Sequence, residues 1–500
     1  MRTGIVVLVG LAACGDNLEP VVENELCLPD TPPAALVPGP FDDPLAVQLP
    51  PSCVPGGLRD LPGRWFVNHE PEQFSFAYPK FEGTCEAGFR RANYLDEDAD
   101  ISDGFSFQTW SDGTRIHYRE LYQFSFDGRV YEYATMTTAC MLPDGTLATV
   151  FGEYDSDRGM HTVDGKGTRF APKDDVAQGL SLVGELAGVS YQIALDGTIA
   201  YLAGPLGLDV VDVSSPAQPV ALAHLDGSFN DVKIAHGGGM TIAYLAPLGE
   251  DPTRVVDVTT PSEPEFLGNV PAYSHSIFLT PDTAPPRMYL ANYSESIPVY
   301  DITAPASPIL VDSVPIDGIG DTAGIHDLHV DGTRIYADKT IDGVVAVDVA
   351  AGFDAPVELG RIPTSYSHAT WAGTAGGRKI AIHGDEGMTP DEGGAFLRVL
   401  DADEASPTFM QEIGRYQSRP EVGIHNMILV GDRAYIAYYQ DGIRVLDLSE
   451  PTQPREIAHY NTWDPDAAWG DAFEGAIGLV VEGDYIYVAD TDRGLVILRR

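Results

Sequence analysis

The chain has 500 residues, a formal net charge of −44 at pH 7 and a hydrophobic content of 44%. This length exceeds the usual size of one domain and predicts two, and the apolar content is sufficient for a large core. The charge argues against nucleic-acid binding and against adhesion to anionic lipid, since both need a basic face, and it favours attraction of cations. A well-solvated acidic surface is the simplest explanation of the charge.

The N-terminus has the features of a secretory signal. Residues 1–13 combine one early arginine with an apolar run that is too short to span a bilayer. The sequence "LAAC" (Leu11–Cys14) resembles the lipobox of bacterial lipoproteins. That resemblance implies cleavage before Cys14 and lipidation of Cys14. Because Gly15 follows and not Asp, it also implies anchoring to the outer membrane. An ordinary signal peptide with a chance cysteine is the alternative.

Residues 14–57 are expected to form an extended spacer, because prolines recur throughout this segment. Beyond Cys14 four cysteines remain, all in the first third of an exported chain, and this even number predicts two disulfides. Three pairings are compatible with the sequence, and order along the chain favours Cys27–Cys53 and Cys85–Cys140.

Residues 58–172 alternate between apolar and polar side chains with period two, and Asp-Gly turn signals separate several of the segments. The alternation predicts a small antiparallel β domain. Its opening, Gly63-Arg64-Trp65, resembles the Gly-x-Trp motif of lipocalin-like barrels. That resemblance covers one strand, and it implies a cavity for a small apolar ligand.

Residues 178–500 contain a repeat centred on an aspartate that follows two apolar residues and precedes one or more prolines in most copies. The repeated aspartates are Asp212, Asp257, Asp301, Asp348, Asp401 and Asp447. Successive copies are 44–53 residues apart, and a period of this length with only strand-like segments predicts a β-propeller. The apolar pair would end a strand, and the aspartate would accept hydrogen bonds from backbone amides in an Asx turn. The prolines would end the hydrogen bonding between strands.

Each period contains four strand-like pieces, except the last, which stops at Arg500 after three. The segment Leu180–Gly188 precedes the first complete period and has no partners of its own. Pairing this segment with the C-terminal sheet would close a ring and remove the open edges. The predicted fold is therefore all-β: a seven-bladed β-propeller closed by an N-terminal strand and preceded by the small β domain.

The region 178–500 resembles the LVIVD-repeat family of bacterial surface β-propellers. The six aspartate-centred phrases and the terminal Gly494–Leu498 carry the resemblance, and the last departs from the pattern because Leu498 replaces the aspartate. The resemblance implies an exported propeller and little about its biochemical role.

Four histidines begin the first strands of the third to sixth periods: His275, His326, His368 and His425. First strands line the channel of a propeller, and each starts on the face where the neighbouring antiparallel second strand ends. The ends of second strands supply further candidates for this mouth of the channel: Asp338, His383, Asp385, Glu386 and Asp490.

Neutral imidazoles and carboxylates bind divalent zinc, iron or manganese, so this mouth is a candidate site for one such ion with open positions for water or substrate. Over an ion, the sequence favours a structural role, in which the same side chains bond loop carbonyls and channel water.

Two functional hypotheses follow. The first is a cell-surface or periplasm-facing scaffold that binds a protein or small-molecule ligand on a propeller face, with no nucleic acid and no membrane contact besides the lipid anchor. The second is a metal-dependent hydrolase or oxidase with its site at the histidine-rich mouth. The sequence contains no Gly-x-Ser-x-Gly elbow, phosphate-binding glycine loop or His-Glu-x-x-His motif.

Overall fold

The structure is a computed structural model. It describes residues 36, 39–69, 76–77, 80–84, 88–92, 105–126, 129–156, 159–173, 176–249, 251–316, 324–364, 366–387, 393–464 and 473–500. The predicted signal peptide and the cysteines Cys14, Cys27 and Cys85 lie outside the described residues. The chain divides into two compact units, one of which ends at Thr168 while the other contains Arg169–Arg500.

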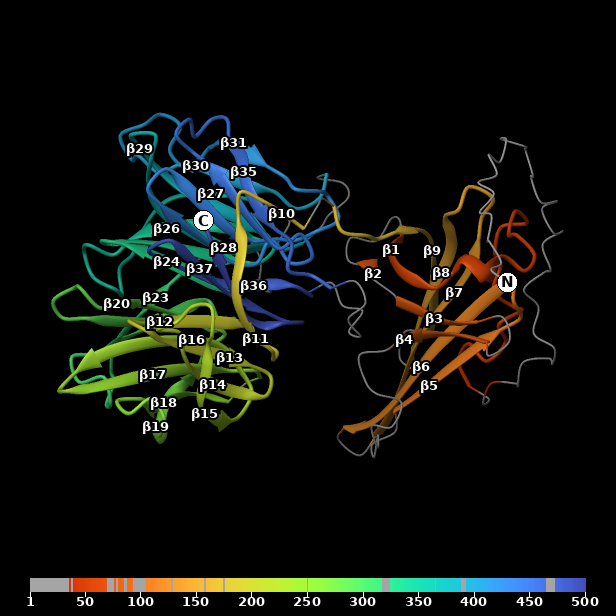
Figure 1. Cartoon of the computed structure of the whole chain (residues 1–500), viewed down its shortest axis with the longest axis horizontal. Helices are drawn as coiled ribbons and strands as arrows, with labels where there is room; N and C mark the ends of the chain where they lie inside the picture. Colours follow the sequence, from red (N-terminus) through yellow and green to blue (C-terminus); the bar gives the residue numbers. More distant parts are fainter. Residues whose placement is uncertain are drawn as a thin grey trace, which may run out of the picture. The chain divides into compact units, whose positions relative to one another are not determined.

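The N-terminal part of the chain folds into one nine-stranded sheet (Figure 1). Its strands are β1 (Gly63–His69), β2 (Phe76–Ala77), β3 (Lys80–Thr84), β4 (Gly88–Ala92), β5 (Phe105–Ser111), β6 (Arg115–Phe126), β7 (Arg129–Met141), β8 (Leu147–Asp155) and β9 (Gly159–Arg169). The strand order is β4-β3-β1-β9-β8-β7-β6-β5, with β2 beside β1. A single 3-10 turn, η1 (Gly57–Asp60), precedes the sheet. Among the described residues no helix is long and apolar enough to cross a membrane.

Residues 39–57, which the sequence assigns to the spacer, pack against this sheet. Phe41 is buried in an apolar cluster with Ala134 and Met136 of β7. The carbonyl oxygen of Phe41 accepts a hydrogen bond from Nε2 of the buried His117 at 3.0 Å. Buried side chains of β6 thus satisfy the backbone of this segment, as buried polar groups require. Residues 39–57 are therefore part of the folded N-terminal unit and do not form an extended spacer.

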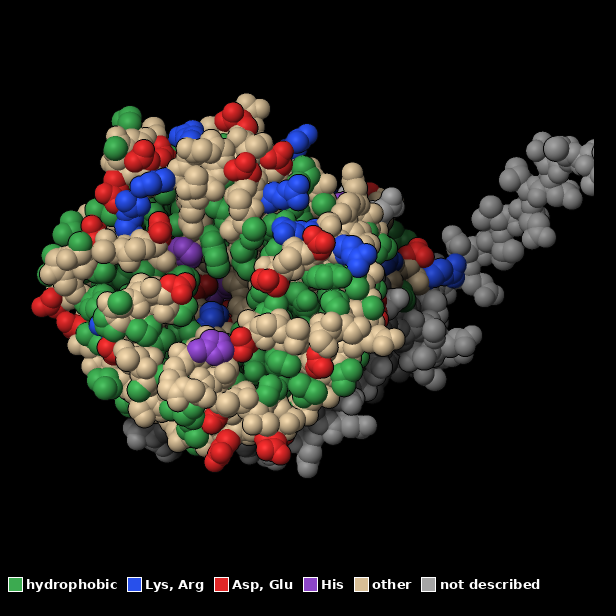
Figure 2. Space-filling view, turned by 60° about the vertical axis from the view of Figure 1, so that its left-hand side comes forward, with side chains coloured by type: hydrophobic (Ala, Val, Ile, Leu, Met, Phe, Trp, Pro, Cys, Tyr) green, Lys and Arg blue, Asp and Glu red, His purple; other side chains and the backbone are tan. Residues whose placement is uncertain are grey.

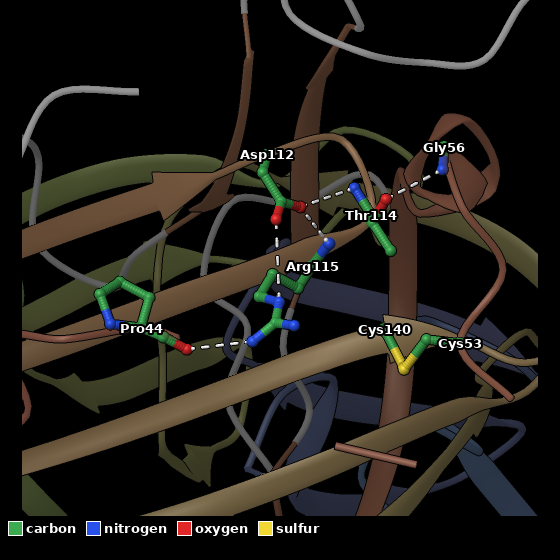
Figure 3. The surroundings of a disulfide bond; sticks show 7 residues. All are labelled: Pro44, Cys53, Gly56, Asp112, Thr114, Arg115 and Cys140. Atoms are coloured by element: carbon green, nitrogen blue, oxygen red, sulfur yellow. Dashed lines mark hydrogen bonds and ion pairs between the residues drawn. A yellow bond between two sulfur atoms is a disulfide. The ribbon is translucent and has the colours of Figure 1, made fainter. Parts of the chain in front are cut away.

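One disulfide, Cys53–Cys140, joins this segment to the end of β7 (Figure 3). The two Cα atoms are 5.6 Å apart, and the cysteines are 87 residues apart in sequence. Beside the bond, the Val54 amide donates to the Met141 carbonyl at 2.9 Å. Figure 3 also shows the neighbouring turn, where the Gly56 amide donates to Oγ1 of Thr114 at 3.1 Å.

This bond corrects the pairing that sequence order favoured. Neither Cys27–Cys53 nor Cys85–Cys140 can form when Cys53 is bonded to Cys140. The reason is that β7 returns across the sheet and brings Cys140 to the loop that holds Cys53. Proximity along the chain does not determine which cysteines become neighbours in the fold.

The strands from β10 to β38 form seven antiparallel sheets among the described residues (Figure 1). Sheet 1 contains β12 (Gln192–Asp196), β13 (Ile199–Gly204), β14 (Gly207–Asp212) and β15 (Val220–Asp226). Sheet 2 contains β16 (Phe229–Gly237), β17 (Met240–Pro247), β18 (Pro252–Asp257) and β19 (Glu265–Tyr273). Sheet 3 contains β20 (Ser276–Thr280), β21 (Arg287–Ala291), β22 (Ser296–Asp301) and β23 (Ile309–Pro315). Sheet 4 contains β24 (Asp327–Asp331), β25 (Arg334–Lys339), β26 (Gly343–Asp348) and β27 (Val357–Ile362).

The remaining three sheets follow the same pattern. Sheet 5 contains β28 (Ser367–Ala375), β29 (Arg378–Asp385), β30 (Leu397–Asp401) and β31 (Glu412–Tyr416). Sheet 6 contains β32 (Met427–Val430), β33 (Arg433–Ala437), β34 (Ile443–Asp447) and β35 (Arg455–Tyr460), with the short β10 (Ala177–Gln178) on its outer edge. Sheet 7 contains β36 (Ala476–Glu482), β37 (Tyr485–Asp490) and β38 (Gly494–Arg499), and its fourth strand is β11 (Ser181–Leu186).

The repeated aspartates end the third strands of sheets 1–6 and form the predicted Asx turns. In all six copies Oδ1 of the aspartate accepts a hydrogen bond from the backbone amide two residues ahead, with N···O distances of 2.7–3.1 Å. Hydrogen bonds from Thr303 and Ser449 lower the pKa of Asp301 and of Asp447, respectively, to about 2. The repeated phrase is therefore a strand terminator.

Strand β11 takes the place of the missing fourth strand in sheet 7. It pairs with β38, with Leu186 opposite Leu495, and it carries a one-residue bulge like those in the fourth strands of sheets 1–6. Gly494, which begins β38 at φ +78°, would place a Cβ 2.6 Å from the Leu186 carbonyl oxygen. Gly343 begins β26 at φ +82° and makes the corresponding approach to the Ile362 carbonyl. The predicted pairing of residues 180–188 with the C-terminal sheet is present.

The core of this unit lies at the seams between successive sheets. One cluster, for example, joins Ile297 and Val299 of sheet 3 to Leu328 and Ile335 of sheet 4. The first strand of each sheet also contacts the first strand of the next, and β36 of sheet 7 contacts β12 of sheet 1. This arrangement brings the starts of the first strands together.

Candidate functional site

Four histidine rings pack in a row at the starts of adjacent first strands. His275 precedes β20, His326 precedes β24, His368 is the second residue of β28, and His425 lies two residues before β32. The ring centroids are 4.3 Å apart for His275 and His326, 4.4 Å for His326 and His368, and 4.2 Å for His368 and His425. These four residues are called the imidazole row. The structure thus brings together the four histidines that the repeat predicted.

The imidazole row lines a cavity of about 350 Å³, called the mouth cavity. Aromatic rings border the row: Tyr293 lies 4.8 Å from His275 and Tyr439 lies 5.5 Å from His425, between centroids. Two carboxylates, Glu386 and Glu474, also line the cavity. The cavity therefore combines neutral nitrogen donors, phenol rings and carboxylate oxygens.

Glu386 directly follows β29 and faces the middle of the row. Its Oε1 lies 3.8 Å from Nε2 of His368. One donor atom each from His326, His368 and Glu386 lie within 4.8 Å of one another. Donor atoms bound to one tetrahedral zinc ion at about 2.1 Å are about 3.4 Å apart, so an ion would shorten the widest of these separations by up to roughly 1.4 Å. The hydroxyl of Tyr439 donates a hydrogen bond to Oε1 of Glu386 and fixes its carboxylate.

Burial keeps the imidazole row uncharged. It lowers the pKa of His275 to about 4 and that of His425 to about 3. For His326 and His368, burial and then the neighbouring histidines hold the pKa well below the usual value of 6.5. Neutral imidazole is the form that binds a metal ion, since the lone pair is free.

The ring nitrogens of the row differ in their hydrogen bonds. His425 donates from Nδ1 to the Ile477 carbonyl at 2.8 Å, which leaves the lone pair on Nε2. Nδ1 of His326 and both ring nitrogens of His368 are buried and have no hydrogen-bond partner in the part of the chain that the structure describes. The backbone of His425 opposes the lowering of the His368 pKa, but it makes no hydrogen bond to the ring. Unpaired buried nitrogens destabilise a fold unless something occupies them, so the middle of the row is suited to a ligand.

The structure does not bring the other predicted residues to this cavity. Asp338, His383 and Asp385 form a separate buried network at the seam between sheets 4 and 5. Nδ1 of His383 lies 3.2 Å from Asp338 Oδ1, and Nε2 lies 3.3 Å from Asp385 Oδ1. Arg398 donates to the second oxygen of Asp385 at 2.8 Å. The prediction failed here because successive residues of a strand point to opposite faces, so Asp385 and Glu386 face different partners.

Asp490, the last residue of β37, is also absent from the residues that line the mouth cavity. Its Oδ1 accepts the amides of Asp492 and Arg493 at 2.9 and 3.0 Å, which caps the turn into β38. Burial raises the pKa of Asp490. Its role is therefore the same kind of turn capping that the repeated aspartates perform.

Sequence reasoning missed Tyr293 and Tyr366 as cavity residues. Both adjoin motifs that the repeat had marked: Tyr293 follows the end of β21, and Tyr366 precedes Ser367-His368. Tyr293 and Tyr439 also have positive φ angles of 52° and 36°. Such conformations are uncommon for bulky residues and concentrate at functional sites, but they are not visible in a sequence.

The LVIVD repeat family matches three segments: residues 187–226, 425–462 and 475–498. The chain carries LVIVD repeats. The matched repeats cover sheet 1, sheet 6 from His425 onward, and most of sheet 7. Among solved structures, the crystal structure of BamB from Moraxella catarrhalis aligns with 11% identity and a TM-score of 0.40, over 76% of this chain and 100% of that chain. No curated protein matches the chain.

Proposed function

We propose that the chain is a binding scaffold, a closed seven-bladed β-propeller that holds one divalent metal ion in the mouth cavity. The seven sheets are its blades. Closure is supported by β11, which supplies the fourth strand of sheet 7, and by the contact between β36 and β12. Closure leaves no open first or last sheet in the array, which removes the seam that would otherwise face solvent.

The proposed metal ligands are His326, His368 and Glu386. The observation that carries the proposal is the convergence of their three donor atoms within 4.8 Å. Three ring nitrogens of the two histidines have no hydrogen-bond partner among the described residues. Two imidazoles bound to one ion by bonds of about 2.1 Å have centroids about 4.6 Å apart at the right angle of octahedral coordination and about 5.3 Å apart at the tetrahedral angle. The 4.4 Å separation of His326 and His368 is nearer the octahedral value. His275 and His425 flank the pair as additional donors.

Two nitrogens and one carboxylate oxygen favour zinc, iron or manganese over calcium and magnesium, which prefer oxygen alone. Tyr439 and the Ile477 carbonyl would orient Glu386 and His425, as outer partners do at metal centres. The acidic chain would raise the local concentration of cations.

Elemental analysis of the full chain, purified without added metal, tests this function. We expect about one zinc, iron or manganese ion per chain, or stoichiometric uptake of zinc after treatment with EDTA. His326→Ala and His368→Ala should lose the ion. His329→Ala is the matched control, because His329 is buried in the same sheet as His326 but does not line the mouth cavity. A folded wild-type chain that takes up no metal, or variants that bind like the control, would refute the proposal.

A metal-dependent hydrolase or oxidase is the second candidate. It is favoured by the three-residue ligand set, because three protein ligands leave an open position of the kind that catalytic sites use. The cavity of about 350 Å³ would give a substrate access to that position. Metal-dependent turnover of ester or phenol substrates that disappears in His368→Ala would select this candidate over a scaffold.

Export and anchoring complete the proposal. We propose that lipidated Cys14 holds the protein at the bacterial outer membrane, on the basis of the sequence "LAAC" and the following Gly15. A Cys14→Ser variant should be released from the membrane fraction. Retention of that variant in the membrane fraction would contradict the anchor.

A further inference from the structure

A second cavity lies further along the same first strands. It has a volume of about 370 Å³ and is called the channel cavity. All seven first strands contribute to its wall, including Leu195 of β12, Ile234 of β16, Phe278 of β20 and Val480 of β36. Figure 2 shows a hollow near the middle of one face, with histidine and basic side chains in and beside it. The volume falls in the range of small-molecule sites, roughly 300–1,000 Å³.

The wall of the channel cavity is mostly apolar, and several of its side chains are only half-buried. These half-buried residues are Leu195, Ile234, Phe278, Leu279, Trp371, Ile428 and Val480. Apolar surface that faces water inside a protein is unfavourable, and an apolar ligand would remove it from water.

Aromatic rings form one side of this wall. His329 packs between Phe278 and Trp371, with centroid separations of 4.9 Å and 4.8 Å. Burial lowers the pKa of His329 to about 4, so its ring is neutral at physiological pH. Three neighbouring uncharged rings offer edges and faces to a further aromatic ring.

Lys233, Asp327 and Thr370 of the wall are already engaged with other protein groups. Lys233 is paired with Asp231. Oδ1 of Asp327 accepts hydrogen bonds from Oγ of Ser276 at 2.6 Å and from the Leu328 amide at 2.7 Å. Thr370 donates to Asp338 at 2.8 Å. The groups left to recognise a ligand are therefore mainly the apolar and aromatic ones, together with the buried Nδ1 of His329, which has no hydrogen-bond partner among the described residues.

From these observations we infer that the channel cavity binds a small, neutral, largely apolar aromatic molecule against Phe278, His329 and Trp371. An anionic ligand would need a free cation, and the Lys233 charge is already compensated by Asp231. Burial raises the pKa of Asp327 to about 7, so this carboxyl carries only part of a negative charge near neutral pH and attracts a cation weakly. The site does not depend on the proposed metal ion, because none of the three proposed metal ligands lines the channel cavity.

Binding of the neutral dye N-phenyl-1-naphthylamine to the full chain tests this inference. The dye becomes fluorescent in apolar surroundings, and we expect saturable binding of one dye per chain. Leu279→Trp would fill the cavity and should weaken binding at least tenfold. Leu222→Trp is the matched control, because Leu222 lies on the outer strand β15 and is 36% exposed. It should bind the dye like wild type.

A second variant keeps the test decisive if Leu279→Trp fails to fold. Trp371→Phe retains an aromatic wall but removes an energy donor, so dye emission excited through tryptophan should fall while directly excited emission remains. EDTA should change neither readout, which separates this site from the metal proposal. Non-saturable binding would overturn the inference. So would wild-type affinity in a folded Leu279→Trp chain, or undiminished energy transfer in Trp371→Phe.

Discussion

The buried network of His383 makes a sharp prediction about stability at alkaline pH. Burial by itself would lower the pKa of His383, but the hydrogen bonds and charges of Asp338 and Asp385 outweigh burial and raise the pKa to about 9. The unfolded value is 6.5. A folded pKa above the unfolded one contributes stability that is fully present below pH 6.5 and is lost as the pH rises through 9.

The size of this contribution follows from the shift. A change from 6.5 to about 9 corresponds to about 3 kcal/mol, at 1.36 kcal/mol for each pKa unit. His383→Gln removes the titrating group while keeping a polar side chain of similar size. The difference in unfolding free energy between wild type and His383→Gln should therefore shrink by about 3 kcal/mol between pH 6 and pH 10.

Urea unfolding followed by circular dichroism at several pH values measures this difference. The pH dependence of every other titratable group is common to wild type and His383→Gln, so it cancels in the difference. His329→Gln is the control, because the pH dependence of stability that His329 causes has the opposite sign to that of His383. Burial lowers the pKa of His329 to about 4, so its pH-dependent effect falls between pH 4 and pH 6.5. Parallel stability curves for wild type and His383→Gln from pH 6 to pH 10 would refute the assignment of a protonated His383.

Three further predictions concern the architecture. Cys140→Ser should destabilise the N-terminal unit by about 4 kcal/mol, because the disulfide closes a loop of 87 residues. Replacing residues 181–186 by Gly and Ser should lower the thermal midpoint by several degrees and cause self-association, because it exposes the edge of β38. Gly343→Ala should cost at least about 2 kcal/mol, since its φ of +82° disfavours a side chain and a Cβ would lie 2.1 Å from the Ile362 carbonyl oxygen.

Each of these three has its own control. Reduction of wild type should reproduce the effect of Cys140→Ser, and a reduced wild type as stable as the oxidised protein would contradict the bond. A Gly-Ser replacement of residues 177–178 removes only the two-residue β10 and should be nearly neutral; equal effects would count against a closing role for β11. Gly332→Ala has φ +65° with nothing within 4 Å, so it should cost only about 1–2 kcal/mol. If Gly343→Ala destabilises the protein no more than Gly332→Ala does, the steric clash is excluded.

Much of the fold could be predicted from the sequence, because the fold repeats one structural unit and many of its contacts join residues close together in the chain. The aspartate phrase predicted six Asx turns, and all six are present, since the interaction spans only two residues. The missing fourth strand predicted the pairing of β11 with β38. The four histidines recur at one place in the repeat, so the repeat alone predicted that their rings would be neighbours.

Other features depended on contacts between distant segments. Residues 39–57 read as a proline-rich spacer, yet buried His117 and Arg119 bind their carbonyls. Cys53 found Cys140 because β7 crosses the sheet. Neither contact leaves a periodic trace in the sequence, because each involves one pair of segments and occurs once.

The sequence by itself determined the six Asx turns, the strand that completes the C-terminal sheet and the common position of the imidazole row. Only the tertiary structure decided that Glu386 faces this row while its neighbour Asp385 faces His383 and Arg398. Side chains of an extended chain alternate, so a shift of one residue changes the face on which a group lies. Local hydrogen bonding determines where a strand ends, whereas the packing of one sheet against the next determines what each side chain meets.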